Sequence, residues 1–233
     1  MKNLILTALL LVSGNAYASG SMHLPEQEWS FNSATTNWEK DTILRGYQVA
    51  TEVCMSCHSM KYIKHRDLAK VGFTEGEIKQ LAKNMEMTIG TPLMSAMSDA
   101  DAKEVYAKAL PDLSVMNKAR PGGADYVYAL LTGYENAPAG HTVPESASYN
   151  KYFPGHNIAM PAPLTSDGQI EYIDGTTATV EQMAKDVTYF LQWTAEPELK
   201  DRQKIGVFAL LYVFLLAILL YFTKRRIWQS VKK

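Results

Sequence analysis

Residues 51–60 read TEVCMSCHSM, and both cysteines of the 233-residue chain lie in this stretch. Cys54 and Cys57 are three positions apart, with two residues between them, and His58 follows directly, which gives the pattern C-x-x-C-H. This pattern is the attachment signature of a c-type haem. Two thiols at this spacing lie on one helical turn and can both reach the vinyl groups of a haem, while the next residue directs its imidazole at the iron. The stretch therefore predicts one covalently bound haem c.

Two other chemistries use closely spaced thiols. A dithiol–disulfide redox pair normally opens a helix within a βαβ pattern, which this sequence lacks, and it does not require His58. A zinc site would need four ligands. The remaining histidines show no paired spacing with the motif; they are His23, His65, His141 and His156. Both alternatives explain the sequence less completely than a haem does.

Residues 1–18 have the three parts of a secretory signal peptide. Lys2 supplies the positive region, residues 4–12 form the apolar run, and residues 16–18 (AYA) give a small-x-small cleavage site. The apolar run is too short to cross a membrane as a retained anchor. We therefore expect cleavage after residue 18 and export of residues 19–199 as the haem domain.

A second apolar run, residues 205–222 (IGVFALLYVFLLAILLYF), contains no charged residue. At about 1.5 Å per residue it gives roughly 27 Å of helix, close to a hydrocarbon core of about 30 Å. A buried soluble helix is the alternative, but this run is apolar on every face and has charged flanks. Residues 200–204 would be a juxtamembrane linker. The five Lys and Arg of the tail, residues 223–233, place the C-terminus in the cytoplasm, and the haem domain in the periplasm of a bacterial inner membrane.

Apolar periodicity and capping patterns predict a mainly α fold with long loops. The helices are expected at 41–54, 75–87, 98–109, 122–132 and 179–194. Asp41 can cap the first of them, and Gly46 in its middle indicates close contact with another helix, plausibly the one at 179–194. Pro197 would separate the last domain helix from the membrane helix.

The remaining segments read mostly as loops and an arm. Residues 133–155 are rich in Gly, Pro, Ser and Asn and are expected to form a long ordered loop. Residues 168–175 (GQIEYIDG) are a possible short hairpin arm. Trp29, Phe31 and Trp38 stand among polar residues near the N-terminus and suggest an arm that packs on the domain or on a partner.

A ligand opposite His58 must come from elsewhere in the chain, and the 11 methionines leave a choice. Met160 lies between prolines, in YFPGHNIAMPAPL, and such a stiff loop can present a thioether without a helix. Met116 has the neighbours of an ordinary core residue, and His156 is a further candidate. The local sequence ranks Met160 first and leaves the other two open. Histidine–methionine ligation fills both axial positions, which favours electron transfer over catalysis.

Several stretches together resemble the cytochrome c1 family, the haem subunits of quinol–cytochrome c oxidoreductase (cytochrome bc1) complexes. They occur in the family's order over about two thirds of the mature chain: residues 44–62, 65–68, 111–134, 152–164 and 172–202, followed by the apolar run. The resemblance implies a class I cytochrome c-like haem domain, closed by packing its first helix on its last, plus one C-terminal transmembrane helix.

The resemblance also implies roles for individual residues. The family's distal methionine matches Met160. Arg120 would pair with a haem propionate, Tyr126 would hydrogen-bond near it, and Pro111 would lie against the haem on the histidine side. Two departures stand out: residues 72–110 are shorter than in many relatives, and His156 stands where the family commonly has glycine. The role of His156 stays open.

The function implied by the resemblance is transfer of one electron from a Rieske iron–sulfur protein to a soluble cytochrome c. The chain would pack against cytochrome b in a dimeric complex and perform no bond chemistry itself. Two alternatives are a free-standing membrane-anchored cytochrome c that feeds a terminal oxidase, and a haem enzyme or gas sensor with a vacant distal position.

The charge distribution bears on the partners. Residues 19–199 contain 14 Lys and Arg against 23 Asp and Glu, a net charge of −9, while the whole chain carries −1. An acidic exported domain repels nucleic acid and steers a basic protein toward itself. The charge therefore argues against nucleic acid as a partner, and ordinary solubility explains it as well as steering does. Within the family resemblance it implies a soluble, basic cytochrome c as the partner.

Overall fold

The computed structural model describes residues 23–231. The expected signal peptide at residues 1–18 lies outside the described residues. The α-helices are α2 (Lys40–Glu52), α3 (Glu75–Asn84), α4 (Asp99–Tyr106), α5 (Gly123–Thr132), α6 (Val180–Ala195) and α7 (Leu199–Val231). Short antiparallel pairs join β1 (Met60–Lys64) to β2 (Pro92–Leu93) and β3 (Ser148–Tyr149) to β4 (Asn157–Ile158). The 3-10 helices are η1 (Ser30–Asn32), η2 (Cys54–Ser56), η3 (His65–Val71) and η4 (Met116–Lys118).

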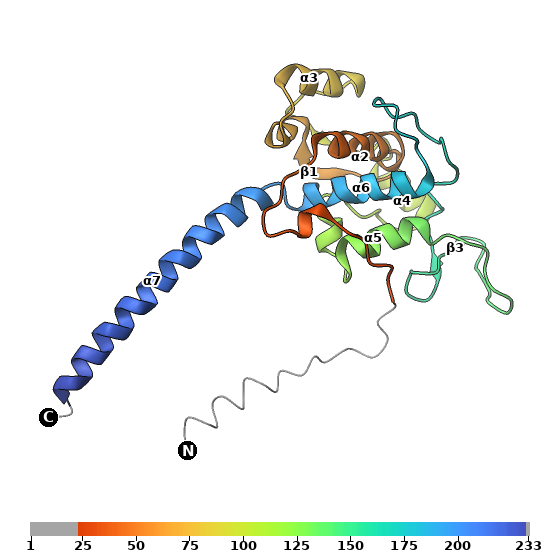
Figure 1. The fold of residues 1–233 in the computed structure, drawn as a ribbon. Coiled ribbons are helices and arrows are strands. Elements are labelled where there is room, and N and C mark those ends of the chain that lie inside the picture. The colour runs from red at the N-terminus through yellow and green to blue at the C-terminus, as the bar shows by residue number, and fades with distance from the viewer. Residues whose placement is uncertain (1–22, 232–233) are drawn as a thin grey trace.

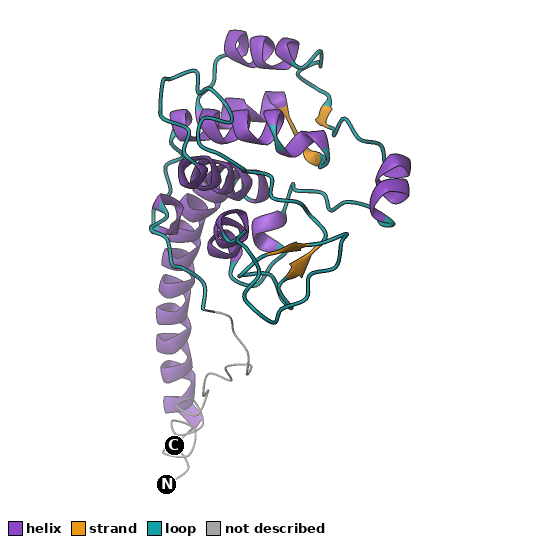
Figure 2. Cartoon of the chain, turned by 90° about the vertical axis from the view of Figure 1, so that its right-hand side faces the viewer, coloured by secondary structure: helices purple, strands orange, loops and turns teal. Residues whose placement is uncertain are grey.

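The chain is mainly helical, as predicted, and long loops connect its short elements (Figure 2). All five expected domain helices are present, with ends that shift by up to three residues. Two of them end early because the chain turns into a left-handed conformation: Glu86 has φ 55° after α3, and Ala107 has φ 56° after α4. The predicted cap at Asp41 is wrong. Glu39 is the N-cap residue of α2, without a side-chain cap, and Asp41 lies inside the first turn.

The centre of the domain is the contact between α2 and α6, which lie against each other in Figure 1. Gly46 makes this contact possible. A Cβ atom at this position would lie 2.1 Å from the carbonyl oxygen of Asp186 and 2.6 Å from the Cβ of Phe190. The prediction that Gly46 permits close packing on the helix at 179–194 is therefore confirmed. Thr179 caps α6 by accepting a hydrogen bond from the Gln182 N–H at 3.1 Å.

An aromatic arm covers the other side of α6. Trp29, Phe31 and Trp38 are all buried, and Phe31 and Trp38 both pack against the ring of Tyr189. The Trp29 indole N–H donates a hydrogen bond of 2.7 Å to Asp125 at the start of α5. The arm expected from the sequence therefore packs on the domain itself.

The hairpin expected at residues 168–175 is wrong, because this segment forms no strand. Its backbone instead bonds a side chain of α2: Gln48 donates to the carbonyl of Glu171 and accepts from the N–H of Ile173. Ile170 and Tyr172 bury their side chains in the core. Residues 168–175 therefore form an irregular segment, called the strap below, that is held by a side chain of α2 and is not a hairpin.

Helix α7 runs out of the domain as a single long rod (Figure 1). It is long and apolar enough to cross a membrane, with a mean hydropathy of 2.7 over its most apolar window. Pro197 lies in the break between α6 and α7, as expected. Residues 200–204, expected as a linker, belong to the first turns of α7.

The first turns of α7 are tied to the domain by polar contacts. The Thr36 N–H donates to Gln203 Oε1 at 2.7 Å, and the Gln203 amide donates to the Ser33 carbonyl at 3.1 Å. Glu196, just before the break, binds both Lys118 and Arg202. The helix therefore leaves the domain from a fixed base.

Candidate haem site

The C-x-x-C-H motif forms one tight turn directly after α2. Cys54 begins the 3-10 helix η2, and its carbonyl accepts hydrogen bonds from the N–H groups of Cys57 (3.1 Å) and His58 (2.8 Å). No disulfide joins the two cysteines, and both are half-buried. The turn therefore presents two free thiols and one imidazole from consecutive backbone positions.

The imidazole of His58 is fixed in one tautomer. Its Nδ1 lies 2.8 Å from the carbonyl oxygen of Pro111. A carbonyl can only accept, so Nδ1 carries the proton and Nε2 keeps its lone pair. Burial lowers the pKa of His58 and outweighs the opposite effects of the Pro111 carbonyl and of Asp112, which favours the neutral ring. A neutral imidazole with a free Nε2 is the form that binds a metal.

A short series of hydrogen bonds keeps Pro111 beside the C-x-x-C-H motif. The Leu113 N–H donates to the Ser59 carbonyl at 2.8 Å, and the Lys61 N–H donates to the Asp112 carboxylate at 2.9 Å. The Ser114 hydroxyl accepts a hydrogen bond of 3.1 Å from the N–H of Tyr62, the next residue of β1. The segment that begins with Pro111 therefore runs along the residues that follow His58, and the carbonyl of Pro111 has little freedom to move.

Met160 lies in the proline-flanked loop that follows β4, and its side chain is half-buried. The hydroxyl of Tyr134 donates a hydrogen bond of 3.1 Å to the Met160 carbonyl. Burial raises the pKa of Tyr134, and the phenol of Tyr126 close by raises it further, so Tyr134 remains a protonated donor. Tyr134 directly follows Gly133, the C-cap residue of α5. The backbone of the Met160 loop is therefore anchored beside the C-terminal end of α5.

Arg120 and Tyr126 lie on this same side of the domain. Burial raises the pKa of Tyr126, and the positive charge of nearby Arg120 opposes that rise. The Arg120 side chain is exposed and, within the described part of the chain, donates a hydrogen bond only to the carbonyl of its neighbour Ala119. Among residues 23–231 no ion pair holds its guanidinium. Arg120 is therefore available for an anionic group beside Tyr126, Tyr134 and the Met160 loop.

The two rival ligands have other surroundings. Met116 opens the 3-10 helix η4 and packs against the hydrophobic core. The ring of His156 stacks on Tyr149 at 5.6 Å and lies 6.1 Å from the ring of His141. His156 has φ 62°, in the left-handed region that glycine adopts most easily, which explains physically why a glycine suits this position. These contacts use His156 within its own loop and favour Met160.

The structure brings the predicted residues into two groups: Cys54, Cys57, His58 and Pro111 in one, and Arg120, Tyr126 and Met160 in the other. Tyr134 is the member that the sequence did not suggest. Two features of the sequence could have identified Tyr134. It is an aromatic residue with a hydroxyl just after a predicted helix, and it belongs to a stretch shared with the family.

Within residues 23–231, the fold and the site together define a mainly helical domain with a tautomer-fixed C-x-x-C-H turn and one C-terminal helix long and apolar enough to cross a membrane. The chain belongs to the Cytochrome C1 family, whose model matches residues 29–105 and 95–231. Membership of this family implies a haem cofactor. The donor set fits that group, since it offers two free thiols, a neutral imidazole and a guanidinium that forms no ion pair with residues 23–231.

Individual relatives are similar over most of their length. Cytochrome c1 of Rhodospirillum rubrum is 37% identical, over 96% of this chain and 94% of that protein. The mitochondrial cytochrome c1 heme protein of Kluyveromyces lactis is 40% identical, over 92% of this chain and 80% of that protein. A Candida albicans protein named cytochrome b-c1 complex catalytic subunit is 41% identical, over 92% and 81% of the two chains.

Proposed function

We propose that this chain is the electron-transfer subunit of a respiratory bc1 complex, and that it takes one electron from a Rieske iron–sulfur protein and passes it to a soluble cytochrome c. The observation that carries the proposal is the His58–Pro111 hydrogen bond, which prepares an imidazole as an iron ligand directly beside two free thiols. The similarity to the Candida albicans protein, whose name places it in a b-c1 complex, supports the assignment to such a complex.

The residues that would hold the cofactor follow from the two groups of the site. Cys54 and Cys57 would attach one haem c covalently, with His58 and Met160 as the two iron ligands. When bound there, the haem supplies a reversible one-electron centre. Further contacts come from Arg120 to a propionate, from Tyr126 near it, and from Pro111 on the histidine side.

The chain's own side chains are suited to electron transfer rather than to bond chemistry. His58 is held by the Pro111 carbonyl, and the Met160 backbone is held by Tyr134. With both residues bound to the iron, no open position would remain for a substrate. A thioether ligand stabilises ferrous iron and raises the reduction potential relative to two nitrogen ligands. The first feature favours electron transfer over catalysis, and the second favours a fairly high reduction potential.

The membrane arrangement follows from helix α7. Residues 205–222 would cross the bacterial inner membrane once, with the haem domain in the periplasm after removal of the signal peptide and the tail in the cytoplasm. The tied base of α7 would hold the domain at a fixed place above the bilayer, where it can pack with cytochrome b in a dimeric complex. The net charge of −9 on residues 19–199 would attract a basic cytochrome c.

Purification of the full chain from its membrane in mild detergent tests the proposal. We expect a cytochrome b and an iron–sulfur protein to co-purify with it, and the reduced complex not to bind carbon monoxide. Purification without either partner would favour a free-standing cytochrome that feeds a terminal oxidase. Rapid carbon monoxide binding would instead indicate a haem enzyme or gas sensor.

A further inference from the structure

Helix α2 connects to both sides of the proposed haem site. Its C-terminal end leads directly into the turn of Cys54 and Cys57. Its middle binds the strap at residues 168–175, which follows the Met160 loop in the chain. Helix α2 is therefore connected both to the turn that carries the two cysteines and to the segment that follows the Met160 loop.

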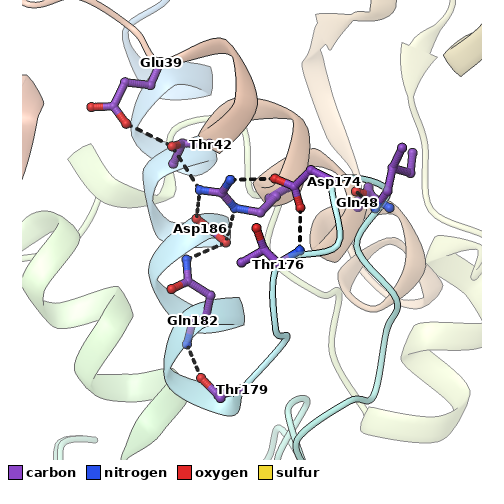
Figure 3. Close-up of polar contacts among 10 residues, drawn as sticks. Glu39, Thr42, Gln48, Asp174, Thr176, Thr179, Gln182 and Asp186 are labelled. Carbon is purple, nitrogen blue, oxygen red and sulfur yellow. Dashed lines mark hydrogen bonds and ion pairs between the residues drawn. The ribbon is translucent and has the colours of Figure 1, made fainter.

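The ion pair between α2 and the strap is made by the guanidinium of Arg45, whose two carboxylate partners are Asp174 and Asp186 (Figure 3). One edge donates to Asp186 on α6, from Nε at 2.9 Å and from a terminal nitrogen at 3.3 Å. The other terminal nitrogen donates to Asp174 on the strap at 2.8 Å. Asp186 is 1% exposed and Asp174 is 32% exposed. Arg45 therefore neutralises a buried carboxylate and still has a donor for the strap.

Only an arginine can make both contacts at once. Its planar group offers five N–H donors in a fixed fork, whereas lysine is a compact point charge. The remaining N–H groups of Arg45 also reach the Thr42 hydroxyl at 3.2 Å. Gln182 adds a hydrogen bond of 2.9 Å to Asp186. The strap contact is thus built onto a polar network that already joins α2 to α6.

The strap is in turn connected to the Met160 loop over a short distance along the chain. Gln169 donates to the Pro163 carbonyl at 2.9 Å and accepts from the Thr165 N–H at 2.8 Å. Leu164, four residues after Met160, is buried in the core. Gln169 therefore couples the strap to Pro163, the second proline after Met160.

We propose that Arg45, through Asp174, is a positioning residue for the distal methionine. The Arg45–Asp174 contact fixes the strap to the helix that leads into the turn of Cys54 and Cys57, and the strap fixes the loop that presents the Met160 thioether. This inference rests on the proposed function, because it assumes that Met160 binds the iron. It makes Arg45 and Asp174 responsible for keeping that bond closed.

The test uses the full-length protein with its haem and three variants. Asp174→Asn removes the charged partner on the strap and leaves the buried Arg45–Asp186 pair intact. Arg45→Lys keeps the positive charge but loses the fork. Lys40→Gln is the matched control, since it removes an ion pair between α2 and Glu77 on α3 that does not touch the strap.

Two readouts are measured for each variant: hydrogen exchange of residues 161–176, and the temperature at which the ferric methionine–iron charge-transfer absorption disappears. For Asp174→Asn we expect exchange on the order of tenfold faster, as for loss of one charge-assisted hydrogen bond, and loss of the absorption at a lower temperature. Arg45→Lys should shift both readouts in the same direction. The control should match the wild type in both.

The outcomes separate this inference from the function on which it rests. Faster exchange in Asp174→Asn with an unchanged absorption would overturn the positioning role and leave the proposed function standing. Unchanged exchange and absorption in both variants would do the same. If Met160→Leu keeps the absorption, Met160 is not the ligand, and both the proposed ligation and the positioning role fail.

Discussion

The Nδ1 proton of His58 is held by the carbonyl oxygen of Pro111, which lies 53 residues further along the chain and 2.8 Å away in space. The acceptor is a backbone atom of a residue whose ring fixes φ, and the segment after it is bonded to the strand that follows the motif. This contact determines which nitrogen of His58 can bind iron. The orientation of His58, the proposed iron ligand, is therefore set by a loop that carries no cysteine of its own.

Met160→Leu tests the distal ligand. Leucine has a similar volume but no sulfur, so we expect the ferric charge-transfer absorption to disappear while the fold persists. The reduction potential should fall by an amount on the order of 0.1–0.3 V, a part of the roughly 0.8 V range that axial ligands cover. Met116→Leu is the control and should keep both properties. Retained absorption in the Met160 variant would show that another residue ligates the iron.

Gly46→Ala tests the packing of α2 on α6. The added Cβ would lie 2.1 Å from the Asp186 carbonyl oxygen, so the helices would have to separate. We expect a loss of about 3 kcal/mol in the free energy of unfolding, measured by thermal or denaturant unfolding. Gly76→Ala on α3 is the control, because a Cβ there meets nothing within 4 Å; it should stabilise by roughly 0.5–1 kcal/mol. A neutral Gly46→Ala would contradict the close contact.

The stabilising contact of Asp174 is expected to weaken in acid. The Thr176 N–H and then the Arg45 guanidinium lower the pKa of Asp174 from 3.8 to about 2. Because the folded pKa lies below the unfolded one, the contribution is complete above about pH 5 and is lost as the pH falls through the folded value. The difference in unfolding free energy between wild type and Asp174→Asn should therefore narrow from about pH 7 to about pH 3. A difference that widens in acid would mean that the carboxylate is not stabilised in the fold.

Association with an electron acceptor should depend on salt. The haem domain has a net charge of −9 over residues 19–199, so its rate of association with a basic cytochrome c should fall as ionic strength rises toward about 0.15 M, where the Debye length is about 8 Å. Stopped-flow electron transfer at several salt concentrations measures this. An acidic cytochrome c is the control and should show no such fall. A salt-independent rate with the basic protein would exclude electrostatic steering.

Local patterns were enough to predict most of the helices. Apolar spacing and capping residues identified all five domain helices, and a glycine in mid-helix identified the contact surface of α2. These features depend on neighbours within one or two turns, which a sequence displays directly. The apolar run at 205–222 was equally plain because length and composition alone define it.

The features that the sequence did not reveal depend on distant partners. The strap at 168–175 alternates like a strand, but its backbone bonds Gln48, more than 120 residues away, so no hairpin forms. Tyr134 anchors Met160 across 26 residues, and Arg45 joins Asp174 across 129. The motif predicts that Cys54 and Cys57 attach the haem, and this stays a prediction. The contacts that surround the motif and Met160 could only be found in the folded structure.

We propose that one haem is joined covalently to Cys54 and Cys57. The intact mass of the purified mature chain, measured after complete denaturation, tests this attachment. We predict the mass of the polypeptide from residue 19 plus that of a single haem, and the same added mass on the proteolytic peptide that contains both cysteines. A denatured chain that carries only the polypeptide mass would contradict the account.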